Sequence, residues 1–228
     1  MNQHVFLERP IGWLSAAHLA RVVSLDDPEG LNRVQVRLIS YAEIAGQDLP
    51  LWARVVAPFA GADRGAFFMP DIDDEVLVVF LQGDPRYPLV LGGLWSGLNA
   101  APASIDAGGN IIKRLRSKNG IQITLEDQTG QETLTLETPG GQTVTLKDGP
   151  GEISIADANG NSVTLDPSGI SIVSGSTVQV QASKVDVTAG TVNVDAVLAK
   201  FSGIVKCEVL QTTSVISTSY TPGAGNVW

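Results

Sequence analysis

Short runs in which apolar and polar residues alternate follow one another along most of the chain, and their spacing changes near residue 120. In the first part, the runs are rich in branched and aromatic residues and end at Gly, Pro or Asp, which is typical of β-strands. Five short strands with no helical pattern between them predict an all-β fold, with a small closed barrel of the OB type. The predicted strands are Leu19–Leu25, Arg33–Ile39, Leu51–Ala57, Glu75–Leu81 and Leu89–Trp95.

From Gly120 onward, apolar residues recur in pairs with one polar residue between the two members. The distance between pair starts shortens from 13 residues to 7 towards the C-terminus. A period of two inside each unit and a repeat between units predict a stack of short β-strands. The residues predicted to face inward are Ile121, Ile123, Leu125, Leu134, Leu136, Val144, Leu146, Ile153, Ile155, Val163, Leu165, Ile170, Ile172, Val178, Val180, Val185, Val187, Val192 and Val194.

Short strands with one apolar stripe need neighbours, both to bury side chains and to pair their edges. Three identical chains wound about one axis meet both needs. The pattern therefore predicts an intertwined trimeric β-helix or β-prism whose core is made of these paired residues. A single-chain solenoid is the alternative fold, although the strict six-residue repeat of a left-handed β-helix is absent, and Gly140–Thr143 does not fit a calcium-binding nonapeptide.

Composition supports two architectures. Trp, Tyr and Phe total 13, and none lies between residues 96 and 200, so we expect a core built on aromatic bulk to end near Trp95. The segment after this point is rich in Gly, Ala and Pro and reads as a connector that ends in a basic cluster. The predicted organisation is an N-terminal extension at 1–15, the barrel at 16–98, a linker and collar at 99–119, β-helical repeats at 120–210 and a C-terminal segment at 211–228.

Charge and sorting signals exclude several classes. The net charge of −9 disfavours nucleic acid as a partner, because an acidic surface repels phosphate backbones. The first residues lack the basic and apolar regions of a signal peptide, and no apolar run has the length of a membrane span. Together with the lone Cys207, this predicts assembly in the cytoplasm without the general secretory route.

No catalytic motif, metal-ligand cluster or cofactor fingerprint is present in the sequence, so we expect no enzyme activity and no cofactor. The acidic run Asp71–Glu75 is interpreted as turn residues at a strand start. His18 is interpreted as an exposed or capping residue. Cys207 is interpreted as a small buried residue, since a reactive thiol needs an electropositive niche.

The run FFMPDIDDEVLVVFLQGDPRYPLVLGGLWSG at residues 67–97 resembles the signature of phage baseplate assembly protein V and of the VgrG spikes of type VI secretion. DPEGLNRVQVRL at residues 27–38 is similar to the first hairpin of that family. The order of barrel, linker and aromatic-free β-repeat resembles the family over nearly the whole chain. The matching positions are Pro70, Asp74–Val78, Phe80, Gly83–Pro85, Pro88–Val90 and Gly92.

The resemblance implies a structural central spike, a homotrimeric membrane-puncturing needle at the baseplate of a contractile injection system or contractile phage tail. Because little sequence precedes the barrel, it also implies a separate hub protein. The basic cluster Lys113, Arg114, Arg116 and Lys118 is interpreted as a solvated collar or a hub contact, and a nucleic-acid patch is disfavoured because no aromatic residue lies beside it. Tyr220 and Trp228 are expected to cap the needle and to bind a PAAR-like tip protein, with only transient contact with the target membrane.

Two other functions compete with this interpretation. A trimeric receptor- or glycan-binding tail fibre would use a similar β-stack, but it requires aromatic side chains along the shaft, where the sequence has none. A nucleic-acid-binding OB module would require a basic aromatic face, which the acidic composition disfavours. The sequence does not tell whether the machine is a phage tail, a tailocin-like particle or an extracellular injection system.

Overall fold

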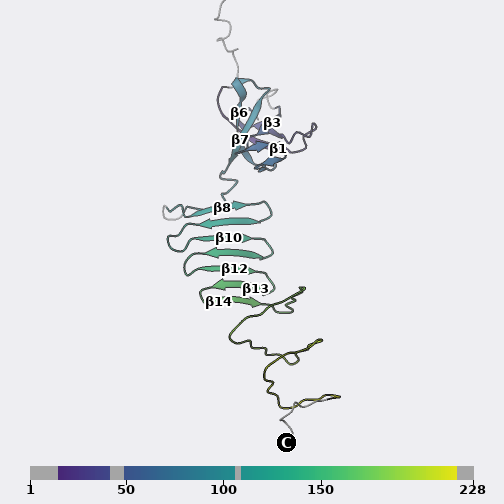
Figure 1. Ribbon diagram of the computed structural model, residues 1–228. Helices are drawn as coiled ribbons and strands as arrows, with labels where there is room; N and C mark the ends of the chain where they lie inside the picture. The colour runs from purple at the N-terminus through teal and green to yellow at the C-terminus, as the bar shows by residue number, and fades with distance from the viewer. Residues whose placement is uncertain (1–14, 42–48, 106–108, 220–228) are drawn as a thin grey trace, which may run out of the picture. The chain divides into compact units, whose positions relative to one another are not determined.

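A computed structural model describes residues 15–41, 49–105 and 109–219 of the chain (Figure 1). The N-terminal part is a closed barrel with the strand order β1-β2-β3-β7-β6. Its neighbours are antiparallel except for the parallel pair β3–β7, and β6 pairs with β1 to close the barrel. This is the predicted OB-type topology. The barrel strands are β1 His18–Ser24, β2 Val34–Leu38, β3 Leu51–Val55, β6 Glu75–Phe80 and β7 Pro88–Leu94.

Alternation along the strands fills the barrel. Every second residue of β2 and of β6 is buried, and β1 contributes two more inward positions. The core is aliphatic, and Phe80 is the one buried aromatic residue among those described. The expectation of a core built on aromatic bulk is therefore wrong. Short β-branched side chains fill so narrow a barrel better than rings do. The buried residues are Ala20, Val22, Val34, Val36, Leu38, Ala53, Val76, Val78, Phe80 and Val90.

Two short features interrupt the barrel. A two-stranded hairpin, β4 Ala60–Gly61 and β5 Arg64–Gly65, lies between β3 and β6. Two 3₁₀ turns, η2 Ile39–Tyr41 and η3 Leu81–Gly83, follow β2 and β6. None of the described residues belongs to a helix long and apolar enough to cross a membrane.

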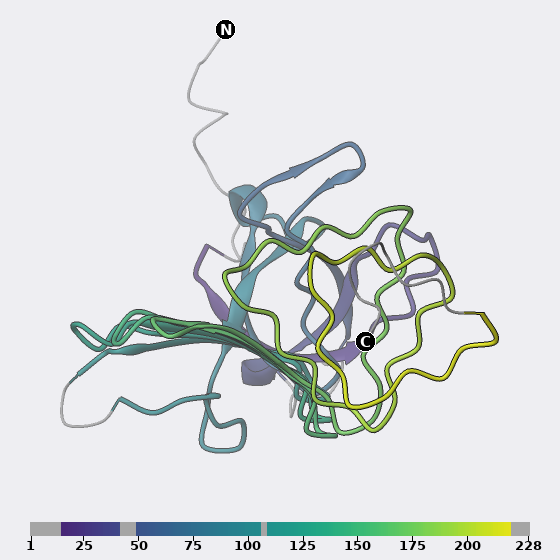
Figure 2. The ribbon, with the colours of Figure 1, turned by 60° about the horizontal axis from the view of Figure 1, so that its bottom comes forward.

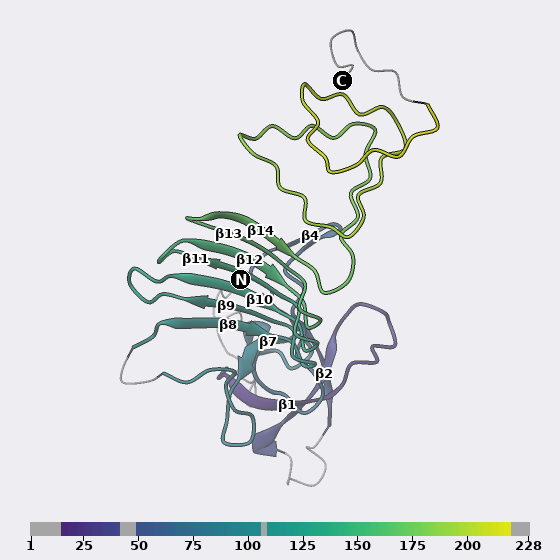
Figure 3. The ribbon, with the colours of Figure 1, turned by 90° about the horizontal axis from the view of Figure 1, so that it is seen from below.

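The next part is a seven-stranded antiparallel sheet in which each strand lies beside the one before it, as Figure 3 shows. It begins at β8, inside the range predicted as linker and collar. Each strand has five residues, and Gly, Asn, Asp or Pro turns join them. The strands are β8 Ile112–Arg116, β9 Gln122–Glu126, β10 Thr133–Glu137, β11 Thr143–Lys147, β12 Glu152–Ala156, β13 Ser162–Asp166 and β14 Gly169–Val173.

After β14, the described residues 174–219 contain no strand, although the apolar pairs continue. A second unit begins at Gln179. Within it the chain winds in open turns around a common centre, as Figure 2 shows. Bends at Ser183, Gly190 and Val197 lie seven residues apart, while those at Glu208 and Thr213 lie five apart. The coil therefore tightens towards the C-terminus.

Candidate functional site

The seven-stranded sheet has one entirely apolar face over β9–β14. The strand registers align the paired Leu, Ile and Val residues into two columns that run across the sheet. We call this surface the apolar face. Its first column is Ile123, Leu136, Val144, Ile155, Val163 and Ile172, and its second is Leu125, Leu134, Leu146, Ile153, Leu165 and Ile170.

None of the described residues 15–41, 49–105 and 109–219 buries the apolar face. Every buried hydrophobic residue among those described lies in the barrel, and the sheet contributes none. Ile155 is 52% exposed and Ile170 is 72% exposed. A groove of about 770 Å³ follows the first column from Ile121 to Val178. A sheet with one bare apolar face must bury it against another element, so this surface requires a partner.

The other face of the same sheet is polar. Its central column consists of hydroxyl side chains, which hydrate readily and leave that face compatible with solvent. The two faces therefore differ in character, and the apolar face is the one that a partner would be expected to cover. The hydroxyl column is Thr124, Thr135, Thr145, Ser154, Thr164 and Ser171.

The three turns that join β8 to β9, β10 to β11 and β12 to β13 share one hydrogen-bond pattern. In each turn, a backbone N–H donates to the side-chain oxygen of the residue four positions earlier, which is Ser117, Thr138 or Asp157. A glycine with positive φ, such as Gly160 at 83°, precedes that donor. The Asn161 side-chain amide also donates to Asp157 and is the main reason that the pKa of this carboxyl falls to about 2. These turns fix the register that aligns the apolar columns.

The open coil at 179–219 has no backbone–backbone hydrogen bond within the part of the chain that is described. Its apolar side chains are strongly exposed, with Val180 at 73% and Val194 at 71%. Figure 1 shows that its successive turns run apart from one another. Buried backbone amides and carbonyls need hydrogen-bond partners, so burying this coil would require partners from outside the described chain. The predicted core residues in the coil are Val180, Val185, Val187, Val192 and Val194; Val178 lies just before it, and Ile121 lies just before β9.

The basic cluster lies on β8 and in the turn after it. The Lys113 ammonium pairs with Asp127, and the Lys118 ammonium lies 2.5 Å from an Asp71 oxygen. This contact lowers the pKa of Asp71 and raises that of Lys118. The Arg114 guanidinium donates to the hydroxyl oxygen of Thr124 and to the carbonyl of Pro102. Among the described residues, Arg116 has no ion pair, so it is the cation of the cluster most available to a partner.

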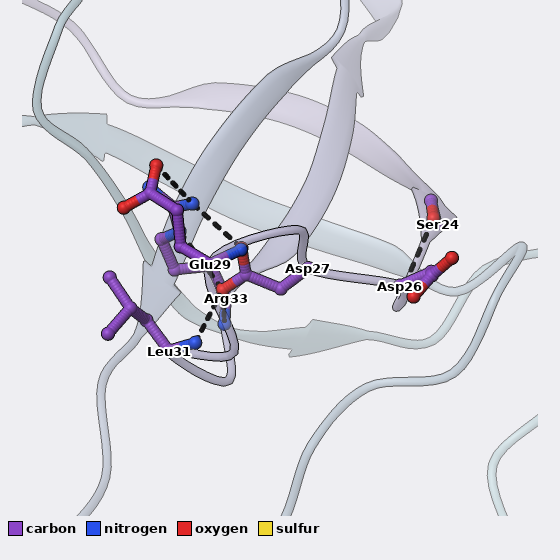
Figure 4. Close-up of polar contacts among 6 residues, drawn as sticks. All are labelled: Ser24, Asp26, Asp27, Glu29, Leu31 and Arg33. Carbon is purple, nitrogen blue, oxygen red and sulfur yellow. Dashed lines mark hydrogen bonds and ion pairs between the residues drawn. The ribbon is translucent and has the colours of Figure 1, made fainter.

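The Asp-Pro-x-x-x-x-Arg segment is a structural turn (Figure 4). The Asp27 side chain is only 4% exposed. It accepts hydrogen bonds from the backbone N–H groups of Glu29, Leu31 and Arg33. The Arg33 guanidinium donates to both oxygens of Asp27, with the shorter contact at 2.7 Å, and this pairing holds the pKa of Asp27 well below its ordinary value. The carboxylate thus holds the β1–β2 loop and makes no site.

In the Gly-Asp-Pro turn an aspartate carboxylate is again held by an arginine. Asp84 is nearly buried and accepts hydrogen bonds from the Arg86 guanidinium, which lowers the pKa of Asp84. Gln82 and Gly83 both have positive φ, so the backbone turns sharply between β6 and β7. Both family signature segments are therefore devices that shape the barrel.

The remaining candidates are not brought together into one site in the part of the chain that the structure describes. Asp71 and Asp74 lie in the turn that leads into β6, where the Asp71 N–H donates to the Asp74 carboxylate. His18 is half-buried against Phe80, with ring centroids 5.6 Å apart, instead of being exposed or capping, because β1 begins at this residue. Cys207 is exposed in the single chain, whereas we expected it to be buried. No group of three or more potential metal ligands occurs among the described residues. Tyr220 and Trp228 lie outside the described residues.

Comparison with known protein families defines the class. Residues 18–95 match the type VI secretion system/phage-baseplate injector OB domain. Residues 133–197 match the phage baseplate V C-terminal trimerisation domain, which supports a homotrimer. The resemblance to structural spike proteins is confirmed: the chain combines the two domains of the phage baseplate V and VgrG family.

Particular relatives are similar over part of the chain. The spike protein VgrG3 of Vibrio cholerae serotype O1 is 33% identical over 89 residues, which is 37% of this chain and 9% of that protein. VgrG4b of Pseudomonas aeruginosa is 34% identical over 108 residues, 45% of this chain and 13% of the relative. The actin cross-linking toxin VgrG1 of V. cholerae is 32% identical over 89 residues, 37% of this chain and 8% of the toxin. The chain therefore spans about a tenth of the length of these relatives.

Proposed function

We propose that this chain is the central spike at the baseplate of a contractile injection system or contractile phage tail. It acts as a homotrimer, seated on a separate hub and carrying a PAAR-type tip. The observation that carries this proposal is the apolar face, which is continuous over six strands and uncovered in the single chain. The spike is assembled in the cytoplasm and leaves as part of a particle.

In the trimer, each chain supplies one wall of a prism with its apolar face turned to the axis. The two columns of one wall then pack against those of the other two, and the hydroxyl column faces water. A close-packed interior resists deformation, so the prism transmits force along its axis. The predicted 19 core residues lie on the inside of this assembly.

In the open coil, the three chains interleave. Each chain takes its backbone hydrogen-bond partners from the other two, which fill the space between its own successive turns. Interleaved chains cannot slide independently. The part of the needle that meets the target envelope is therefore held by all three chains together.

The proposal assigns the hub and the tip to different parts of the chain. The cluster Lys113, Arg114, Arg116 and Lys118 lies on β8 and in the turn after it, and Arg116 would offer its guanidinium to an acidic hub surface. Tyr220 and Trp228, near the C-terminus of the sequence, would offer aromatic side chains to the tip protein.

The proposed action is mechanical and not catalytic. Sheath contraction drives the spike forward, and a narrow rigid needle concentrates the force on the envelope. The match to the actin cross-linking toxin VgrG1 covers only 8% of that protein, so its toxin activity is not carried over to this chain. A glycan-binding fibre would require aromatic platforms on the shaft, and residues 96–200 contain no aromatic residue.

Immunogold electron microscopy of purified particles tests the proposal. An epitope tag on the C-terminus should place the gold label on the particle axis, at the leading end below the baseplate. A tail fibre would instead give label at several peripheral positions around the baseplate. Peripheral label would overturn the central-spike proposal.

A further inference from the structure

The residues that follow β14 have the alternation of a further strand. Val178 and Val180 are apolar, whereas Gln179 and Gln181 are polar. If the chain turned back here as it does after β12, Val180 would lie beside Ile172 and extend the first apolar column by one residue. No strand occurs in the described residues 174–219, however, and β14 is the last strand of the sheet. The alternation alone therefore does not decide where the sheet ends.

Three earlier turns show what a turn at this place requires. Each has five residues, and the N–H of the first residue donates to the carbonyl of the fifth at 2.8–3.0 Å. The fourth residue is always a glycine, with φ between 82° and 91°. This is the hairpin loop in which a left-handed residue follows a type I turn, and glycine adopts that conformation at the lowest cost. The turns are residues 117–121, 138–142 and 157–161.

The segment after β14 departs from this pattern at its fourth residue. Residues 174–178 read Ser-Gly-Ser-Thr-Val, so Thr177 stands where the three turns have glycine. A β-branched residue takes a positive φ only as a rare outlier, and φ at Thr177 is not positive. Within the described residues 174–178, no backbone hydrogen bond closes the segment as it closes the three turns. The segment therefore does not turn the chain back along β14.

The packing of each turn on the one before it ends at the same place. A Cβ built on the glycine of the first or second turn would lie 3.4 Å from a side chain of the next turn. A Cβ on Gly160, in the third turn, would meet no atom within 4 Å. The next side chain of this series would come from Gly175, which has none. The two packed pairs are Gly120 with Pro139 and Gly141 with Ala158.

Other hydrogen bonds give residues 174–177 a course of their own. The Gly175 N–H donates to Oδ1 of Asn161 at 3.2 Å, which ties the chain to the preceding turn. The Ser174 hydroxyl donates to the carbonyl of Thr177 and accepts from the N–H of Ser176, both at 3.3 Å. The segment thus has a defined conformation without forming a hairpin.

The outer edge of β14 is left without a strand among the described residues. An edge strand presents unpaired N–H and C=O groups that pair with another strand when one is available. We infer that Thr177 ends the pairing of the chain with itself and leaves the edge of β14 to a second copy of this chain. The identity of that partner rests on the proposed trimeric spike. In that spike, Thr177 fixes where the prism ends and the interleaved coil begins.

A disulfide reporter tests whether the chain pairs with itself after β14. The cysteines introduced by Val173→Cys and Gln179→Cys would lie opposite each other on the hydroxyl face if a hairpin formed. They would be a non-hydrogen-bonded pair with Cα atoms about 4.5 Å apart, a distance that a disulfide spans. Cys207→Ser removes the one other cysteine of the chain. A non-reducing denaturing gel and peptide mapping then distinguish a disulfide within one chain from a disulfide between chains and from free thiols.

Restoring the turn should raise the disulfide within one chain. Gly175→Ala, Ser176→Asn and Thr177→Gly together copy the middle of the third turn. The within-chain disulfide should become about tenfold more frequent than with the native segment, which corresponds to the strain of one non-glycine residue at positive φ. The matched control, Gly175→Ala with Ser176→Asn, keeps Thr177 and should stay at the native level. Thr177→Gly alone changes one exposed residue, should also raise the disulfide, and serves if the triple variant does not fold.

The outcomes separate this inference from the proposed function. A within-chain disulfide that is as frequent with the native segment or the matched control as with the restored turn would show that Thr177 does not stop the sheet. A folded variant with the restored turn and no such disulfide would show the same. The comparison is made inside one chain, so it holds even for a monomer. A monomeric wild-type chain would instead overturn the proposed spike, and with it the second copy as the partner of β14.

Discussion

Replacing Ile155 by aspartate tests what covers the apolar face. Ile155 lies in the middle of β12 and is 52% exposed in the single chain. Burying a whole Ile side chain contributes about 1.5–3 kcal/mol, so covering the exposed half contributes about 1 kcal/mol per copy. A carboxylate taken out of water costs several kcal/mol more, and the trimer would contain three that repel one another. The trimer should therefore lose more than about 10 kcal/mol, or about seven orders of magnitude in its assembly constant.

Ser154→Asp is the matched control for this substitution. Ser154 is the neighbouring residue in the same strand, but it lies on the hydroxyl face and is less exposed than Ile155 in the single chain. If no other chain covered the apolar face, the sheet would tolerate aspartate at Ile155 at least as well as aspartate at Ser154. Light scattering after size-exclusion chromatography should instead find Ser154→Asp trimeric and Ile155→Asp monomeric. Equal masses for the two variants would refute the reasoning.

Two further changes test the turns that shape the fold. The pKa of Asp27 is lowered in the folded barrel, so its carboxylate stabilises the barrel above the unfolded pKa of about 3.9, and this stabilisation is lost as pH falls through the folded-state pKa. Asp27→Asn should lower the melting temperature at pH 7 and weaken its dependence on pH below about 5; an unchanged pH profile would contradict this role. Gly160→Val should cost about 1–2 kcal/mol per chain in urea unfolding, because φ is 83° there, whereas Gly160→Asn should cost clearly less. Equal losses would show that backbone strain is not the cause.

The barrel strands could be predicted because each shows its own alternation and ends at strong turn residues. All five predicted strands exist, with ends shifted by at most two residues. The β4–β5 hairpin was not predicted, since two-residue strands are too short to show a period. β8 was not predicted because Lys113, Arg114 and Arg116 mask its alternation, and the segment was interpreted as a collar. Its register shows that Lys113 occupies the place of an apolar residue beside Leu125.

For the repeats after Gly120, the limit of prediction from sequence is a different one. Alternation tells which side chains share a face, and it predicted the residues that the registers of β9–β14 place in two apolar columns. It does not tell whether the neighbouring strand comes from the same chain. From β8 to β14 the neighbours lie within one chain as an antiparallel sheet, whereas the same pairing of Val residues after β14 gives an open coil with no strand among the described residues. The domain boundaries and the individual core residues stay predictions.

The mass of the full chain in solution tests most directly whether two further copies enclose the apolar face. Native mass spectrometry at neutral pH should give a single species of about three times 24.0 kDa, and its mass should not change on dilution to nanomolar concentration. A well-folded particle with the mass of one chain would contradict the account.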